Sequence, residues 1–90
     1  VTFNDEMQWQ VNSNPSAGIF NFSLQATDGD MVSAKIYEVS GRLVQSSQMI
    51  ANGFIQRINI DLTEAKYASG LYLLEVVAGQ QKQSFRLLKQ

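Results

Sequence analysis

Clusters of turn-forming residues cut this 90-residue sequence into short segments, and this spacing restricts the chain to a fold made of many short strands. Between the clusters lie the β-branched, aromatic and alternating apolar residues that are typical of strands. We predict seven strands, over residues 7–11, 19–25, 32–39, 42–48, 54–61, 71–78 and 82–88. Antiparallel strands in this number and spacing favour an all-β, immunoglobulin-like sandwich. The chain has no cysteine and therefore lacks the Cys…Trp…Cys framework of antibody domains.

The alternation of apolar and polar residues predicts which strand faces are buried. In residues 19–25, apolar side chains occupy the even positions and polar ones most odd positions, so one face should be buried and the other wet. In residues 54–61, a similar but less regular inner row begins at Phe54. Residues 71–77 are apolar on both faces, which predicts a central strand covered from two sides.

Local turn chemistry predicts how the strands connect. The Asp-Gly pair at 28–29 and the Asn-Gly pair at 52–53 accept the positive φ of hairpin turns, so we predict two hairpins there. Gly79 is expected to turn the chain between the last two strands. Residues 63–67 contain good helix formers, and at most one helical turn is expected there, as a crossover. Gly70 should follow this turn in a left-handed conformation.

Composition indicates one globular domain. Hydrophobic residues make up 44% of the chain and charged residues 17%, far from the composition of disordered segments. A net charge of -1 gives no field that would attract nucleic acid, so we expect no nucleic-acid partner. No apolar run approaches the ~20 residues of a membrane span, so direct membrane insertion is not expected. Because the chain begins at Val1 rather than at a methionine, we expect it to be a piece of a longer protein.

The sequence offers no residues for catalysis or for a cofactor. It contains neither histidine nor cysteine, and nothing in it brings paired carboxylates, or serine and lysine, together. Asp28 and Asp30 are better explained by a turn than by a calcium site, because calcium needs six to eight oxygen ligands. Aromatic side chains could form a platform for sugars, although core packing is favoured for them; they are Trp9, Tyr37, Tyr67 and Tyr72.

Several short motifs follow one another in a fixed order. They are an Asn-Pro-x-x-Gly start, a strand ending in Ile-Tyr-Glu and followed by Gly-Arg, an Asp-Leu-Thr turn, Ser-Gly-x-Tyr, a later glycine and a basic and apolar ending. Their residues are Asn14, Pro15, Gly18, Ile36–Glu38, Gly41, Arg42, Asp61–Thr63, Ser69, Gly70, Tyr72, Gly79 and Arg86–Lys89. This order resembles the type A C-terminal sorting domain of the type IX (Por) secretion system of Bacteroidota. The chain departs from the family in a longer spacing between Asp61 and Gly70 and in Arg86 and Leu88, where lysine and valine are commoner.

The resemblance implies a non-catalytic secretion signal that is recognised as a folded domain. Its implied partners are outer-membrane shuttle and translocon proteins, together with a sortase-like protease that cuts upstream of the domain. The passenger would pass through the periplasm and then reach the cell surface or outer membrane, or be secreted; both removal and retention of the domain occur in the family. Residues 1–12 would be the linker end and first strand, and 13–90 the sorting domain, forming one unit with 7–12.

The resemblance also implies recognition residues. These are Gly41, Arg42, Phe85, Arg86, Leu87, Leu88, Lys89 and Gln90, with Lys89 as an exposed charged tip at a free strand end. For Gly41, a purely structural role in a turn with positive φ is at least as well supported. Two other classes of function stay open: a structural or adhesive sandwich, and a carbohydrate-binding module of a cell-surface protein. An exposed edge strand could also pair two copies into a homodimer.

Overall fold

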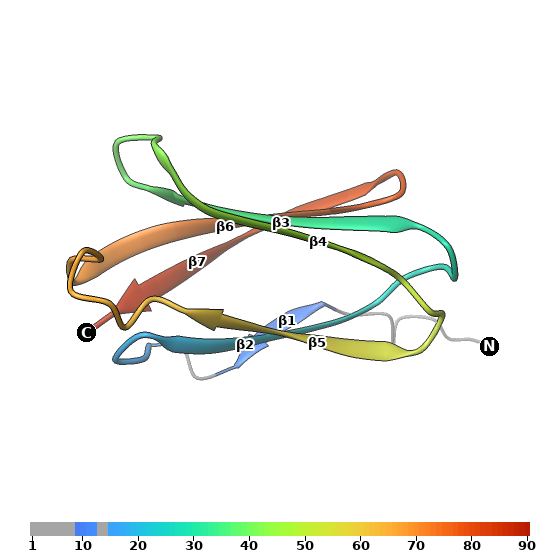
Figure 1. The fold of residues 1–90 in the computed structure, drawn as a ribbon, viewed down its shortest axis with the longest axis horizontal. Coiled ribbons are helices and arrows are strands. Elements are labelled where there is room, and N and C mark those ends of the chain that lie inside the picture. Colours follow the sequence, from blue (N-terminus) through green and yellow to red (C-terminus); the bar gives the residue numbers. More distant parts are fainter. Residues whose placement is uncertain (1–8, 13–14) are drawn as a thin grey trace.

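The computed structural model describes residues 9–12 and 15–90, and these residues form seven strands in two packed sheets (Figure 1). The strands are β1 (Gln10–Asn12), β2 (Ile19–Gln25), β3 (Met31–Glu38), β4 (Leu43–Ile50), β5 (Ile55–Asp61), β6 (Gly70–Ala78) and β7 (Gln81–Lys89). All pairs of these strands are antiparallel, so the predicted all-β sandwich is confirmed. The part of the first predicted strand before residue 9 lies outside the described residues.

One sheet has the strand order β1-β2-β5 and the other β4-β3-β6-β7. This is the immunoglobulin-like arrangement with the fourth strand moved into the second sheet, beside β3. β6 lies between β3 and β7, which confirms its predicted place in mid-sheet. The chain passes from one sheet to the other between β2 and β3, between β4 and β5, and between β5 and β6.

The two hairpins predicted from Asp-Gly and Asn-Gly are wrong, because each pair lies where the chain changes sheet. Residues 28–29 do form a tight turn, in which the Asp30 amide donates to the Thr27 carbonyl at 3.0 Å. The Gly29 amide also donates to Ala51 O at 2.8 Å, and the Ala51 amide donates to Asp30 O at 2.9 Å. The two crossovers therefore hold each other at one end of the sandwich. The β-hairpins are β1–β2, β3–β4 and β6–β7, the last at the predicted Gly79 turn.

The core lies between the sheets and is filled by the inward rows of the strands. Phe22 is fully buried at its centre, with ring centroids 6.3 Å from Trp9 and 5.1 Å from Phe85. Burial of each such aromatic side chain contributes about 1.5–3 kcal/mol. Trp9, Tyr67 and Tyr72 are buried in this core and Tyr37 is half-buried outside it, so the four side chains form no common platform for sugars. The Phe54 prediction is wrong: β5 begins one residue later, and Phe54 is 74% exposed.

The crossover between β5 and β6 contains a turn and no helix. Its Tyr67 amide donates to the Glu64 carbonyl at 2.9 Å, which closes one turn. Asp61 Oδ1 accepts from the Thr63 hydroxyl at 2.6 Å and from the Thr63 amide at 2.9 Å, and these bonds lower the pKa of Asp61. Gly70 has a positive φ of 139°, but it is the first residue of β6 and does not close a helix.

Candidate functional site

Most of the residues that the sequence marks for recognition meet at one end of the sandwich. The β3–β4 turn, the C-terminal end of β7 and the crossover before β6 all lie at this end (Figure 1). The segment 15–18 joins them, because Ser16 forms an isolated parallel bridge with Lys89. Asn14 lies outside the described residues. Gly79 is at the opposite end of β6, since Gly70, and not Ala78, pairs with Lys89.

The β3–β4 turn presents a charged side chain to solvent. The Gly41 amide donates to Glu38 O at 2.8 Å, and Gly41 has a φ of 92°, which favours glycine. Arg42 Nη2 lies 2.8 Å from Glu38 Oε2, and Ser40 Oγ donates to the other carboxylate oxygen at 2.7 Å. The bond from Arg42, and then that from Ser40, lower the pKa of the Glu38 carboxyl. The Arg42 side chain is 72% exposed.

A group of exposed leucines lies beside this turn on the outer face of the four-stranded sheet. We name it the outer leucine patch; it consists of Leu43, Leu71, Leu73 and Leu88. Tyr37 joins its two sides, because it pairs with Leu43 on β4 and with Leu73 on β6. Leu71 and Leu73 are 43% and 41% exposed, so the prediction that both faces of β6 are covered is wrong for the described residues. Contiguous exposed apolar side chains of this kind typically mark an interaction surface.

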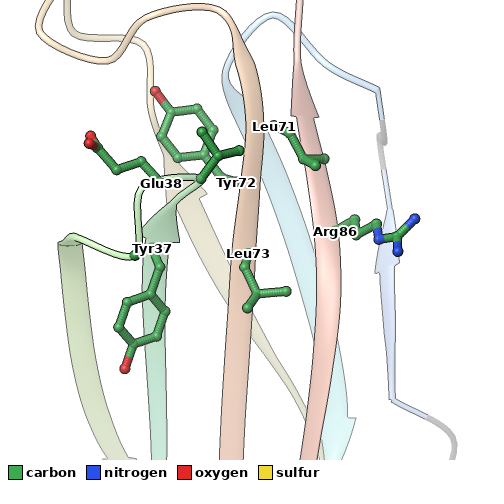
Figure 2. A pocket seen from close by; sticks show the side chains of 8 residues that line it. Tyr37, Glu38, Leu71, Tyr72, Leu73 and Arg86 are labelled. Carbon is green, nitrogen blue, oxygen red and sulfur yellow. The ribbon is translucent and has the colours of Figure 1, made fainter.

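The patch is hollowed. A depression of about 440 Å³ lies over Tyr37, Leu71 and Leu73 and extends to Arg86 on β7 and to Gly41 in the turn (Figure 2). Figure 2 shows Tyr37, Leu73 and Arg86 on three neighbouring strands, in agreement with their register. Arg86 and Leu88 are among the residues proposed from the sequence for recognition, whereas Leu71 and Leu73 are not. Their signal was present in the apolar outer positions of β6.

The end of β7 is tied to two other segments, which we call the C-terminal clasp: Ser16, Tyr67 and residues 88–90. The Ser16 amide donates to Leu88 O at 3.1 Å, and the Gln90 amide donates to Ser16 O at 2.8 Å. Lys89 Nζ donates to the Tyr67 carbonyl. Lys89 is only 9% exposed, so the predictions of an exposed charged tip and of a free strand end are both wrong.

The remaining residues of the terminal stretch divide between the two faces of β7. Leu87 is fully buried and Phe85 is half-buried against the core, so both help to hold the strand. Arg86 and Leu88 are exposed on the outer face, and Gln90 is exposed beyond the strand. A receptor could therefore reach Arg86, Leu88 and Gln90 without opening the sandwich.

The other motif residues shape the backbone at this end. Pro15 is exposed in the loop before β2, whereas Gly18 is buried, and Leu62 N donates to its carbonyl at 2.7 Å. Tyr72 is buried, and its hydroxyl donates to Ala68 O at 2.6 Å, four residues upstream. This is the tyrosine-corner arrangement of immunoglobulin-like sandwiches, which fixes the crossover to β6. Burial raises the pKa of Tyr72.

The described residues contain no group of three or more histidine, cysteine or acidic side chains that could hold a metal ion. Within the same residues, no helix has the length and apolar character needed to cross a membrane.

Comparison with known proteins agrees with the order of motifs. No curated protein matches the chain. A family profile described as the secretion system C-terminal sorting domain, the Por secretion tail, matches residues 11–90 and thus nearly the whole chain. This family consists of non-catalytic signal domains whose role implies interaction with the secretion machinery and export across the outer membrane. The chain therefore belongs to the C-terminal sorting domains of the Por, or type IX, secretion system, and it acts as a secretion signal.

Proposed function

We propose that shuttle and translocon proteins of the outer membrane bind this domain, as a folded body, through the outer leucine patch and the adjoining Arg42 turn. The observation that carries this proposal is a coincidence of two independent features. Arg42, Arg86 and Leu88 are marked by the family motifs. Arg86 and Leu88 pair with the exposed Leu73 and Leu71 of β6, and Arg42 follows Gly41, which lines the hollow over these leucines.

The energetics of the patch support a binding role. A fully buried leucine contributes about 1.5–3 kcal/mol, and roughly two-fifths of the surface of Leu71 and Leu73 is still in water. A partner that covers both side chains would gain the rest of this energy. Protein interfaces commonly have such apolar anchors at the centre and charged residues at the rim. Arg42 fits the rim, because an exposed ion pair such as that with Glu38 contributes little and is readily exchanged.

We also propose a path of export for the parent protein and a site of proteolytic cleavage. The parent protein crosses the periplasm, and the domain then delivers it through the outer membrane to the cell surface or to the medium. A sortase-like protease cuts near or before residues 1–12, and residues 13–90 act, together with 7–12, as the sorting unit. A cut there would leave the β2–β5 core pairing and the C-terminal clasp intact, because both are formed by later residues.

A reporter fused to residues 1–90 tests the recognition surface in a bacterial host that has a type IX system. Leu71→Thr/Leu73→Thr removes two apolar anchors and places β-branched threonines, which favour strands, at both positions. The matched control is Met31→Thr/Ile50→Thr, a cross-strand pair on the same sheet face that is 51% and 55% exposed at the other end. We expect surface delivery to fall at least tenfold for the first variant and to stay unchanged for the control.

The stability of the purified variants must be measured in parallel. Exposed substitutions change stability by about 0.5 kcal/mol or less, so both double variants and Arg42→Ala should unfold at nearly the wild-type urea concentration. Arg42→Ala should also reduce delivery. Wild-type delivery by Leu71→Thr/Leu73→Thr would overturn the proposed surface, and a joint loss of stability and delivery in Arg42→Ala would make Arg42 a structural residue.

A further inference from the structure

We infer that Lys89 is a positioning residue: it supports export by holding the recognition end of the sandwich together, and it is not itself read by a receptor. This rests on the proposal above that the receptor binds the outer leucine patch and the Arg42 turn. It assigns the terminal residues of β7 two separate tasks, because the outward side chain of Leu88 belongs to the patch while the inward side chain of Lys89 belongs to the clasp.

The burial of Lys89 is the first observation. The inward row of β7 runs through Phe85 and Leu87 to Lys89, and the lysine is buried like Leu87, whereas Phe85 is half-buried. Its ammonium group donates to the Tyr67 carbonyl inside the fold. A buried charged group is tolerated when such a hydrogen bond replaces water. A side chain that is 9% exposed offers a receptor almost no surface.

The clasp joins segments that are distant in sequence. Lys89 reaches the crossover at Tyr67, while the backbone on either side of it bonds to Ser16. A further backbone bond, from Leu62 N to Gly18 O, joins the segment before β2 to the crossover before β6. Lys89 is thus the side chain through which the end of β7 fixes the crossover.

Tyr67 and the next residue, Ala68, connect the clasp to both sides of the proposed recognition surface. On one side, Gln45 Nε2 donates to the Tyr67 hydroxyl at 3.2 Å, and Gln45 lies on the strand that follows the Arg42 turn. On the other side, Ala68 accepts the Tyr72 hydroxyl, and Tyr72 lies between Leu71 and Leu73. Loosening Tyr67 would therefore disturb the positions of the turn and of the patch together.

The experiment separates three models of Lys89: positioning, direct reading and global stability. Lys89→Met keeps the length and apolar stem but removes the ammonium donor, whereas Lys89→Arg keeps a donor. Leu24→Val serves as the matched control, because Leu24 is buried in β2 near the opposite end, where it pairs with Gln56. The fourth protein carries a short Gly-Ser extension after Gln90, which leaves the clasp bonds in place and blocks any reading of the chain end.

Each protein is assayed for urea unfolding, for amide hydrogen exchange and, as a reporter fusion, for surface delivery. We expect Lys89→Met to lower the urea midpoint by about 1 M, from the loss of one charge-assisted hydrogen bond and the slope typical of small domains. Exchange should rise in residues 62–72 and 88–90 and stay unchanged in β2 and β5. Surface delivery of Lys89→Met should fall at least tenfold. Leu24→Val, with a similar urea midpoint, should be delivered like the wild type. Lys89→Arg and the extended chain should be delivered like the wild type.

Three results would overturn the inference. Loss of delivery by Lys89→Met with unchanged exchange would show that the ammonium is read directly. Loss of delivery by the extended chain would show that the chain end is read. Equal losses by Lys89→Met and Leu24→Val would show that Lys89 contributes only to global stability. The surface proposal fails separately, because it is decided by Leu71→Thr/Leu73→Thr, in which the clasp is untouched.

Discussion

Gly18 occupies a position where a side chain would meet both steric and conformational obstacles. Its φ is 144°, which favours glycine, and a Cβ at this residue would lie 2.9 Å from Thr63 Cγ2 and 3.1 Å from the Leu62 carbonyl oxygen. The Leu62 amide donates to the Gly18 carbonyl at 2.7 Å, so the two segments cannot separate without losing this bond. Gly18→Ala is therefore expected to destabilise the domain strongly.

Gly70 provides a matched reference for the size of this effect. Its φ of 139° is nearly the same, but a Cβ there would meet nothing within 4 Å. The backbone strain in Gly70→Ala should cost about 1–2 kcal/mol. Gly18→Ala carries the same strain and in addition an overpacking cost of about 1–3 kcal/mol. The total for Gly18→Ala is then about 2–5 kcal/mol, and the difference between the two variants measures the clash.

Urea unfolding followed by tryptophan fluorescence gives both values, since the single Trp9 is buried in the core. With a slope of about 1–3 kcal/mol per molar urea, the two midpoints should be separated by several tenths of a molar or more. Identical midpoints for Gly18→Ala and Gly70→Ala would refute the steric reasoning, because they would mean that Thr63 moves aside at no cost. Wild-type midpoints for both would refute the conformational reasoning as well.

Three further predictions concern the core and two titrating groups. Phe22→Ala should destabilise the domain by about 3–5 kcal/mol through the cavity it leaves, as measured by calorimetry; a loss below 1 kcal/mol would mean that the core refills. Burial raises the pKa of Tyr72 above its ordinary 10.0, so the contribution of Tyr72 to the free energy of unfolding is complete below pH 10.0 and is lost as the pH rises through the folded-state pKa. Tyr72→Phe should lower the free energy of unfolding by about 1 kcal/mol at neutral pH and should remove this decline at alkaline pH. Wild-type stability of Tyr72→Phe at neutral pH would show that the hydroxyl bond is dispensable. The hydrogen bond from Arg42 lowers the pKa of Glu38 below its ordinary 4.5, so the contribution of Glu38 to the free energy of unfolding is present above pH 4.5 and is lost as the pH falls through the folded-state pKa. In urea titrations at several pH values, Glu38→Gln should reduce this loss of stability at acidic pH. An unchanged dependence of stability on pH would contradict the pairing of Glu38 with Arg42.

The positions of the strands could be predicted from the sequence, whereas two of the connections between them, at residues 28–29 and 52–53, could not. Alternation in residues 19–25 identifies the buried face of β2 because side chains in a strand alternate with a period of two. The Asp-Gly pair at 28–29 correctly predicts a tight turn, but a tight turn can lead either to a neighbouring strand or across to the other sheet. That choice depends on which inner rows meet in the core, and this is a long-range property.

The fate of Lys89 shows a similar competition between two signals. Its charge predicted exposure, while the period of β7 placed it in the inward row behind Phe85 and Leu87. The period prevailed, because the carbonyl of Tyr67 is available as an acceptor inside the fold. Acceptors of this kind are supplied by a crossover 22 residues away, and no local pattern in the sequence identifies them.

β6 is the opposite case. Its apolar pattern predicted that both faces are buried, whereas among the described residues its outer face is exposed. Leu71 and Leu73 make the outer face of β6 apolar, as in a strand that is buried on both faces. The sequence pattern does not say whether this face is buried by the same chain or by a binding partner. In the folded domain the inner face is covered by the other sheet, while the outer face carries the hollow that extends to Gly41 and Arg86. If a sorting signal is bound as a folded body, its binding face must be apolar enough to attract a receptor and must remain open until the receptor arrives. The outer leucine patch meets both requirements, and its leucines are therefore the residues at which substitution should separate export from stability most cleanly.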